Sequence, residues 1–343
     1  MVRLGAFAIL AAGIFAACGK GTPLTSGTAT PPPAYVPSVT SQYPIPTKSS
    51  RPMGIAVGSD FNIWFTEYAS SKVGILTTAG TVATPEPVTP TANAGPNGIA
   101  SGPNSLLWFT ETKVGKIGQI SLTTPPTFTE FVLPNAAARP AGIALGSDGN
   151  MWVTDPGTNS IWKVSKSGVV GSPCALPAKA APLGITNGPD GALWFTEPGI
   201  NRIGRLPVTT TGACGTLTQY RIPTKNAGVT GIAAGSDNAL WFTEKTAKKL
   251  GRISITGHVT NQYSLAPAVS PNALLQGVDG NFYFTDTAGN HIGQFVVGTA
   301  KVTLFSIPTA NSQPTAIVLG PDNQIYFTET AANNIGQFKY FCC

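Results

Sequence analysis

The sequence predicts an all-β fold in which seven copies of one unit form a closed ring. The unit reads GPDGALWFTEPGINRIGRL at residues 188–206, and copies of it recur 42–47 residues apart. Short strands and tight turns repeating every 40–50 residues or so are typical of propeller blades. Apolar runs with a 3.6-residue period, which helical repeats require, are not found. We therefore predict a seven-bladed β-propeller of four-stranded antiparallel blades. The aromatic residue of each copy falls at Trp64, Trp108, Trp152, Trp194, Trp241, Tyr283 and Tyr326.

Composition agrees with one ordered domain of this kind. Of the 343 residues, 42% are hydrophobic and 10% are charged, and 39 Gly and 30 Pro supply turns. The net charge of +6 is not gathered into a Lys/Arg run, so no nucleic-acid partner is expected. We expect the chain to be a monomer.

Residues 1–18 have the pattern of an export signal. Arg3 precedes the apolar run Leu4–Ala17, which is too short to span a membrane. The run ends Phe15-Ala16-Ala17-Cys18, which resembles a bacterial lipobox with Phe15 in the usual Leu position. We expect acylation at Cys18 and a lipid-anchored protein of the bacterial cell envelope. The alternative is an ordinary secretory signal with a coincidental cysteine, which would give a secreted protein.

Residues 19–40 are rich in Thr, Pro, Ser and Gly and are interpreted as a tether. The propeller is assigned to residues 41–343. Each repeat offers four strands: one carrying Pro-x-Gly-Ile, the aromatic strand, a strand after the acidic residue, and a strand ending near Pro. Residues 182–185 and 216–223 are examples of the first and the last.

The ring is predicted to close through the N-terminal strand. The seventh repeat stops after its third strand, at residues 334–340, while Thr40–Pro46 reads TSQYPIP, much like TLTQYRIP at residues 216–223. The N-terminal strand should therefore complete the last blade and remove the open sheet edges. Pro44 fits an outermost strand, where one side of the ladder needs no donor.

Four cysteines follow Cys18, and an exported protein can keep disulfides. A bridge between Cys174 and Cys214 is possible, because both lie near the fourth strands of neighbouring blades. All three pairings of Cys174, Cys214, Cys342 and Cys343 stay open. Zinc spacing such as CxxC is absent.

Thirteen of the fifteen carboxylates belong to the repeat itself. Six lie in the turn before the aromatic strand, where turn chemistry explains them. Seven follow the aromatic residue by three positions, and five of these have a basic residue five positions later, expected to lie opposite across a hairpin. The alternative for these seven is a carboxylate ring that binds a cation. The seven are Glu67, Glu111, Asp155, Glu197, Glu244, Asp286 and Glu329; the basic residues are Lys72, Lys116, Arg202, Lys249 and His291.

The remaining acids, Glu86 and Glu130, fall in predicted outer strands. His258 is expected to be solvated in a turn, and His291 to pair with Asp286. The nucleophile elbow GxSxG, a phosphate loop and a dinucleotide fingerprint are all absent from the sequence.

The repeat from Gly184 to Leu206 resembles those of the virginiamycin B lyase (streptogramin B lyase) family, and the resemblance covers about residues 41–340. It implies a seven-bladed propeller and a Mg²⁺-dependent elimination that opens the ester ring of a cyclic depsipeptide. It also implies catalytic histidines in the Pro-x-Gly/Ala-Ile segments of the sixth and seventh repeats, with a glutamate two residues before the second. Those positions hold Asn272, Thr315 and Gln313. Neither Asn nor Thr can accept the proton, so we predict no catalytic residues, and Mg²⁺ only if the elimination is retained.

The variable position of the Pro-x-Gly/Ala segments, here called the slot, is interpreted as a ring for a small-molecule or surface ligand. A water-filled funnel without a ligand is the other interpretation. The first functional hypothesis is a binding or structural propeller held to a membrane by its lipid; the second is a lyase-like enzyme using other residues. The slot residues are Met53, Asn97, Ala141, Leu183, Thr230, Asn272 and Thr315.

Overall fold

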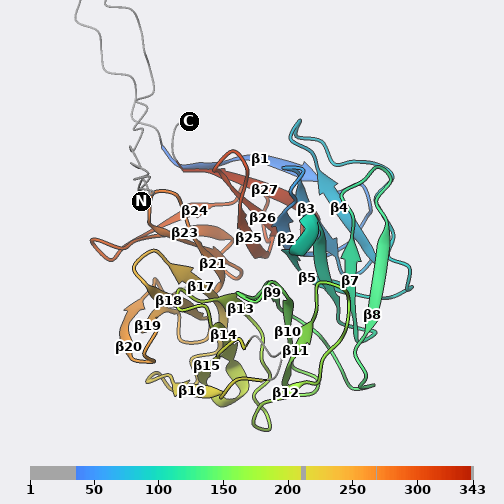
Figure 1. The fold of residues 1–343 in the computed structure, drawn as a ribbon. Helices are drawn as coiled ribbons and strands as arrows, with labels where there is room; N and C mark the ends of the chain where they lie inside the picture. Colours follow the sequence, from blue (N-terminus) through green and yellow to red (C-terminus); the bar gives the residue numbers. More distant parts are fainter. Residues whose placement is uncertain (1–35, 210–213, 268, 341–343) are drawn as a thin grey trace, which may run out of the picture.

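A computed structural model describes residues 36–209, 214–267 and 269–340. Its strands form seven antiparallel sheets around a central axis (Figure 1), which confirms the predicted propeller. Two short 3-10 segments, η1 (Pro103–Ser105) and η2 (Pro198–Ile200), interrupt the strands. Within these three ranges, no helix has the length and apolar character that crossing a membrane requires.

We number the blades along the chain. Blade 1 contains β2 (Pro52–Val57), β3 (Ile63–Glu67) and β4 (Lys72–Leu76), and blade 2 contains β5 (Pro96–Ser101), β6 (Leu107–Glu111), β7 (Lys116–Ile120) and β8 (Phe128–Val132). Blade 3 contains β9 (Ile143–Leu145), β10 (Met151–Asp155), β11 (Ser160–Val164) and β12 (Cys174–Ala175). Blade 4 contains β13 (Ile185–Asn187), β14 (Leu193–Glu197), β15 (Arg202–Leu206) and β16 (Thr218–Arg221). Blade 5 contains β17 (Val229–Gly235), β18 (Ala239–Glu244), β19 (Lys249–Ser254) and β20 (Val259–Ser264). Blade 6 contains β21 (Pro271–Gln276), β22 (Phe282–Asp286), β23 (His291–Val296) and β24 (Lys301–Ser306). Blade 7 contains β25 (Pro314–Leu319), β26 (Ile325–Glu329), β27 (Asn334–Lys339) and, as its outermost strand, β1 (Ser38–Pro44).

Blade 1 departs from the prediction of four strands in every repeat. Its fourth position holds only two isolated bridges to β4, at Val82 and Val88. The segment between them contains Pro85 and Pro87, which have no backbone N–H to give to a ladder. A continuous strand therefore cannot form there.

The N-terminal strand closes the ring, as predicted. Strand β1 pairs antiparallel with β27, with Pro44 opposite Asn334 and Ser38 opposite Lys339. Gln42 adds a side-chain link by donating to both carboxylate oxygens of Glu329, at 2.8 and 3.0 Å. The last blade is thus assembled from both ends of the described chain.

The antiparallel topology gives the ring two distinct faces. Loops between second and third strands, and between one blade and the next, lie on one side, which we call the mouth face. Loops between first and second strands lie on the other, the base face. Strand β1 runs from the base face at Ser38 to the mouth face at Pro44.

Seven threonines join the innermost strands into a closed circuit. Each follows the second-strand Phe or Val, is fully buried, and accepts a hydrogen bond of 2.8–3.1 Å from an amide of its own blade. Each hydroxyl then donates to the slot carbonyl of the next blade, at 2.6–3.2 Å. The circuit closes where Thr328 donates to Met53. Its members are Thr66, Thr110, Thr154, Thr196, Thr243, Thr285 and Thr328.

Small residues after the slot let neighbouring blades approach this closely. In five blades a Gly occupies that position, and a Cβ there would overlap the carbonyl oxygen of the next blade. Ala273 and Ala316 take the position in blades 6 and 7. The threonine-to-carbonyl distances at those two interfaces are the longest of the seven, 3.0 and 3.2 Å, because the methyl group holds the carbonyl away.

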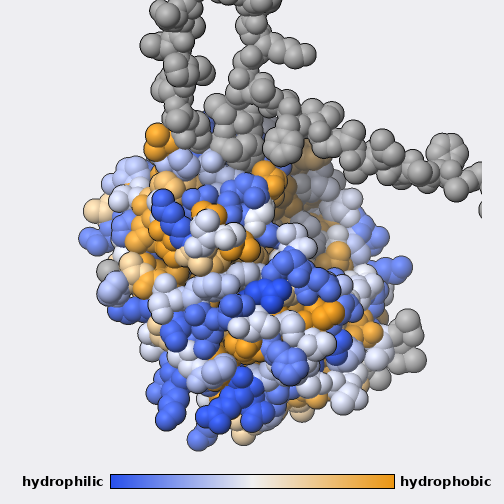
Figure 2. All heavy atoms as spheres, turned by 90° about the vertical axis from the view of Figure 1, so that its left-hand side faces the viewer, coloured by the Kyte–Doolittle hydropathy of each residue, from blue (hydrophilic) through white to orange (hydrophobic). Residues whose placement is uncertain are grey.

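Within each blade, a large side chain on one strand faces a smaller residue on the neighbouring strand. In six blades a third-strand Gly faces a second-strand Phe, whose ring fills the space where a Cβ would stand. Blade 3 instead pairs Trp162 with Val153. Moving the bulk from one strand to the other conserves the core volume. Outside the core, Figure 2 shows hydrophilic residues alternating with small hydrophobic groups over the rim.

The acids of the base-face turns are structural, as the sequence predicted. Asp190, for example, accepts a hydrogen bond from the indole N–H of buried Trp194, at 3.0 Å. In blade 2 the turn position is Asn104, and Trp108 is the one buried indole of the described residues that lacks a hydrogen-bond partner.

Of the pairings left open by the sequence, the structure contains Cys174–Cys214. This disulfide links β12 of blade 3 to the segment before β16 of blade 4. Cys342 and Cys343 lie outside the described residues, as do the export signal, Cys18 and most of the expected tether.

The threonine circuit makes a direct prediction. Thr196→Val keeps the shape but leaves the Gly184 amide and the Thr230 carbonyl without partners, so it should cost about 1–3 kcal/mol of unfolding free energy. Thr218→Val, at an exposed outer-strand position, should stay within about 0.5 kcal/mol of wild type. Urea unfolding of both variants checks this, and equal stabilities would contradict a structural role for the circuit.

Candidate functional site

All seven slot residues line one central cavity of about 280 Å³, together with the small residue that follows each of them. The cavity lies towards the mouth face, because in five blades the slot directly follows a residue paired with the end of the second strand, as Pro52 is with Glu67. The structure therefore brings together the complete set of residues singled out from the sequence.

A backbone bulge aims the slot side chains inward. In five blades the slot and the small residue after it together oppose a single threonine, which shifts the strand register. Bulges commonly re-aim side chains next to binding sites. Since the threonine circuit holds the slot carbonyl, the side chain can change without altering the backbone.

The slot ring has a polar side and a more apolar side. Thr230, Asn272 and Thr315 are consecutive around the ring, and Met53, Ala141 and Leu183 lie among the other four positions. On the polar side, the Asn272 amide donates to the Thr315 carbonyl at 3.0 Å. Thr315 accepts from the Thr330 hydroxyl at 2.7 Å and donates to the Gln313 carbonyl at 3.1 Å.

Lys245 adds a positive charge to this polar side, which the sequence analysis missed. Its ammonium group donates to the Asn272 side-chain oxygen at 3.2 Å, and among the described carboxylates none forms an ion pair with it. Burial lowers the pKa of Lys245. The seven slot residues are themselves uncharged, so Lys245 supplies the positive charge at the edge of the ring. A comparison of the repeats at the position after the hairpin acid would have found it, since the other blades have Tyr, Thr or Pro there.

On the mouth face of blades 1 and 2, two more cations lie around an aromatic ring. Lys113 lies 4.5 Å and Arg51 5.5 Å from the ring centroid of Tyr68. Such contacts are favourable cation–π interactions. They leave the mouth face rich in positive charge.

The hairpin acids do not face the cavity with free carboxylates. All seven are fully buried, and in blades 4, 5 and 7 a glutamine of the outermost strand donates to the acid: Gln219 to Glu197, Gln262 to Glu244 and Gln42 to Glu329. Among the residues that the structure describes, no three His, Cys, Asp or Glu side chains gather where they could hold a metal ion.

The expected pairing of hairpin acids with basic residues is only partly correct. The register places Glu67 opposite Lys72 and Glu111 opposite Lys116. The lysines instead form ion pairs with two outer acids: Glu86 at 3.4 Å, which lies in the irregular segment of blade 1 and not in the predicted strand, and Glu130 of β8 at 2.6 Å. Those carboxylates are the better partners because the hairpin acids are buried beneath them.

The two histidines lie away from the cavity. His291 pairs with Asp286 at 3.0 Å, as predicted. His258 is exposed in the turn before β20.

Comparison with known proteins identifies the relatives of this ring. The model of the virginiamycin B lyase family matches residues 36–215 and 208–340. The chain belongs to the virginiamycin B lyase family. No curated protein sequence matches it significantly.

Solved structures of virginiamycin B lyases share the whole propeller. A streptogramin B lyase is 32% identical, with a TM-score of 0.80 over 87% of this chain and 96% of its own. The virginiamycin B lyase of Staphylococcus aureus is 29% identical, with a TM-score of 0.80 over 88% and 99%. A catalytically inactive variant of that enzyme, solved with quinupristin, is 29% identical, with a TM-score of 0.79 over 88% and 99%.

The residues at the implied family positions do not fit Mg²⁺. Gln313, Asn272 and Thr315 offer only neutral oxygens, whereas Mg²⁺ is usually held by one or two carboxylates. The Asn272 side-chain oxygen already accepts a hydrogen bond from the Lys245 ammonium, and this positive charge disfavours a second cation beside it.

The buried acids make stability depend on pH. Burial, with a contribution from the neighbouring charge of Glu130, raises the pKa of Glu111 from 4.5 to about 8, and neither Glu111 oxygen accepts a hydrogen bond. Folded protein thus holds a proton that unfolded protein releases, and stability falls as the pH rises from about 4.5 to about 8. Glu111→Gln should remove this contribution and be more stable than wild type at pH 8–9, with a smaller difference near pH 5.

The control is Glu130→Gln in the same blade. Burial opposes ionisation of Glu130, but hydrogen bonds from Lys116 and Thr91 lower its pKa, so this variant should lose stability at pH 8. Chemical unfolding from pH 5 to 9 checks both signs. Destabilisation by Glu111→Gln across the whole range would refute the assignment.

Proposed function

We propose that this member of the virginiamycin B lyase family binds a small molecule at the mouth of its central cavity and does not linearise streptogramin B antibiotics. The observation that carries the proposal is the state of the sixth and seventh slots. Asn272 and Thr315 have no titratable group near neutral pH, and their polar atoms already bond to Lys245, Thr330 and the backbone. A general base needs both a suitable pKa and a free position beside the proton.

The cavity supports a ligand with two different ends. Lys245, Asn272 and Thr315 favour a hydrogen-bonding or anionic group, while Met53, Ala141 and Leu183 favour an apolar body. A mostly apolar pocket with a few convergent polar groups is typical of small-molecule sites. At about 280 Å³ the cavity matches a small ligand, or one side chain of a larger one.

A second candidate function is a lyase that uses a different base. The observation in its favour is Lys245, whose pKa is lowered by burial and whose nitrogen lies at the sixth slot. Only a neutral amine can accept a proton, and a lowered pKa increases the neutral fraction of Lys245.

Incubation with quinupristin, followed by chromatography of the linear product, separates the two. Wild type should give no turnover with or without Mg²⁺, because a positioned acid–base group contributes about 10²–10⁴ in rate and the family positions lack one. The S. aureus enzyme is the positive control. Mg²⁺-dependent turnover by wild type would overturn the binding proposal, and its loss in Lys245→Met would establish the second candidate. The combined variant Asn272→His, Thr315→His and Gln313→Glu asks whether the scaffold still accepts the substrate.

Export and lipid anchoring are further parts of the proposal. They are supported by the signal pattern ending at Cys18 and by the Cys174–Cys214 disulfide, since disulfides persist in oxidising compartments. A single acyl chain binds membranes only weakly, so stable anchoring needs several chains.

Cys18→Ser tests the anchor. Full-length wild type expressed in bacteria should sediment with membranes, and Cys18→Ser should move to the soluble fraction or remain uncleaved. Cys343→Ser is the control for loss of a cysteine and should behave like wild type. Equal membrane fractions for wild type and Cys18→Ser would remove the lipoprotein interpretation.

A further inference from the structure

Two arginines lie directly opposite each other at the outer edge of blade 4. In the β15–β16 pair, Arg202 faces Arg221. Like charges opposite one another in an antiparallel pair are destabilising. Such a pair calls for a compensating negative charge.

Blades 1 and 2 instead pair their third-strand lysine with an acid of the same blade. In blade 2, Lys116 faces the neutral Val132 and forms an ion pair with Glu130. The residue of blade 4 at the register position of Glu130 is Gln219, since each faces the third-strand glycine of its blade. Blade 4 therefore has a second cation where blade 2 has valine, and an amide where blade 2 has its acid.

The nearest carboxylate does not neutralise the arginines. Glu197 is opposite Arg202, but it is fully buried and both of its oxygens accept from the Gln219 amide at 2.7 Å. Burial raises the pKa of Glu197 to about 7, so the carboxyl group is only partly charged near neutral pH. Arg202 itself contacts the neutral Gln219 oxygen, at 3.4 Å.

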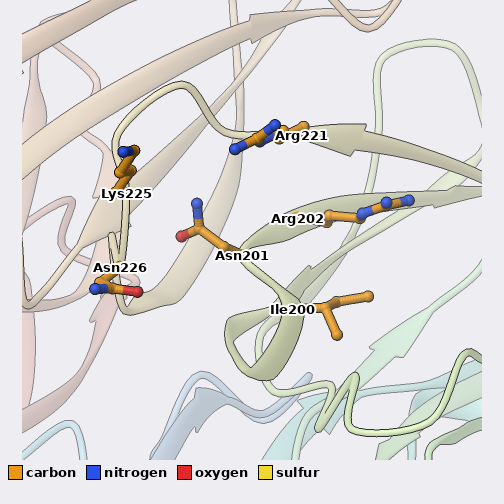
Figure 3. Close-up of a pocket in the computed structure, with 6 residues that line it drawn as sticks. All are labelled: Ile200, Asn201, Arg202, Arg221, Lys225 and Asn226. Carbon is orange, nitrogen blue, oxygen red and sulfur yellow. The ribbon is translucent and has the colours of Figure 1, made fainter.

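A third cation and a cavity complete the arrangement (Figure 3). A cavity of about 410 Å³ on the mouth face is lined by Ile200, Asn201, Arg202, Arg221, Lys225 and Asn226. Figure 3 shows the Arg221 side chain extending toward the side on which Lys225 lies, while the Arg202 guanidinium points the other way. None of the three cations forms an ion pair with a described carboxylate.

The loop that carries Lys225 is held in place. The Asn201 amide donates to the carbonyls of Thr224 and Ile222, at 2.8 and 3.3 Å, and its oxygen accepts from the Ala227 amide at 2.9 Å. Lys225 is therefore presented from a fixed backbone rather than from a free loop.

We propose that Arg221 and Lys225 form a binding site for a phosphate group, with Arg202 at its edge. Guanidinium groups bind tetrahedral oxyanions through paired N–H donors, and a phosphate bound by Arg221 and Lys225 supplies the negative charge that this edge of the blade lacks. The site lies at the outer edge of blade 4, separate from the central cavity, and does not depend on the function proposed for that cavity. Free phosphate and a phosphate ester share this chemistry.

The test measures melting temperature and calorimetric binding with inorganic phosphate, with glycerol phosphate, and with sodium chloride at the same ionic strength. Phosphate should bind wild type and raise its melting temperature beyond the chloride value, since a ligand that binds only the folded state stabilises it. Binding of glycerol phosphate at least as tightly as phosphate points to an ester; tighter binding of free phosphate points to the ion.

Three variants make the test specific. Arg221→Val copies blade 2 and should weaken phosphate binding about 10-fold or more. Without phosphate, at low salt, it should melt at or above the wild-type temperature. Gln219→Glu gives Arg202 the internal acid of blade 2 and should also weaken binding. Lys301→Val removes one charge from the outer strand β24 of blade 6 and should leave phosphate binding unchanged.

The melting temperatures of wild type and Arg221→Val, compared with and without phosphate, decide whether the site exists. Reversal of the ranking of wild type and Arg221→Val on addition of phosphate supports the site. Equal effects of phosphate on wild type, Arg221→Val and Lys301→Val, or an effect no larger than that of chloride, would mean general screening of the net charge and overturn it.

Discussion

A threonine hydroxyl that both accepts and donates holds each pair of neighbouring blades together. Thr196, for instance, accepts from the Gly184 amide of its own blade and donates to the Thr230 carbonyl of the next. A glycine follows the slot in this blade, and in five other blades the threonine lies where the strand register shifts by one residue. Blade spacing, the bulge and the inward direction of the slot side chains therefore all depend on one hydroxyl per blade. Because the circuit holds the backbone at the slot, the slot side chain can differ among the seven repeats without moving it.

Much of this fold could be predicted from the sequence because its determinants are local and repeated. The period of the aromatic strand, the turn residues before it and the similarity of Thr40–Pro46 to an outer strand identified seven blades and their closure. The slot ring was also predictable, since it is the variable position in an otherwise constant motif. Blade 1 has no fourth strand because Pro85 and Pro87 lack the backbone N–H that a strand pairing needs. The repeat pattern alone does not reveal this exception.

The parts that were missed involve choices between competing partners. Lys116 had two carboxylates within reach, and depth decided between them: Glu111 is buried beneath the sheet, while Glu130 lies beside the lysine. Lys245 was missed because its partner, Asn272, belongs to the following blade. The contact joins residues 27 positions apart in the sequence, so the repeat comparison can single out Lys245 as an exception but cannot name its partner. The exchange of bulk between Val153 and Trp162 shows the same limitation within one blade.

The direction of β1 has a consequence for how the ring is presented. The strand begins on the base face at Ser38 and ends on the mouth face at Pro44. The strand that closes the ring therefore enters it from the base face, on the side away from the central cavity and from the cationic outer edge of blade 4.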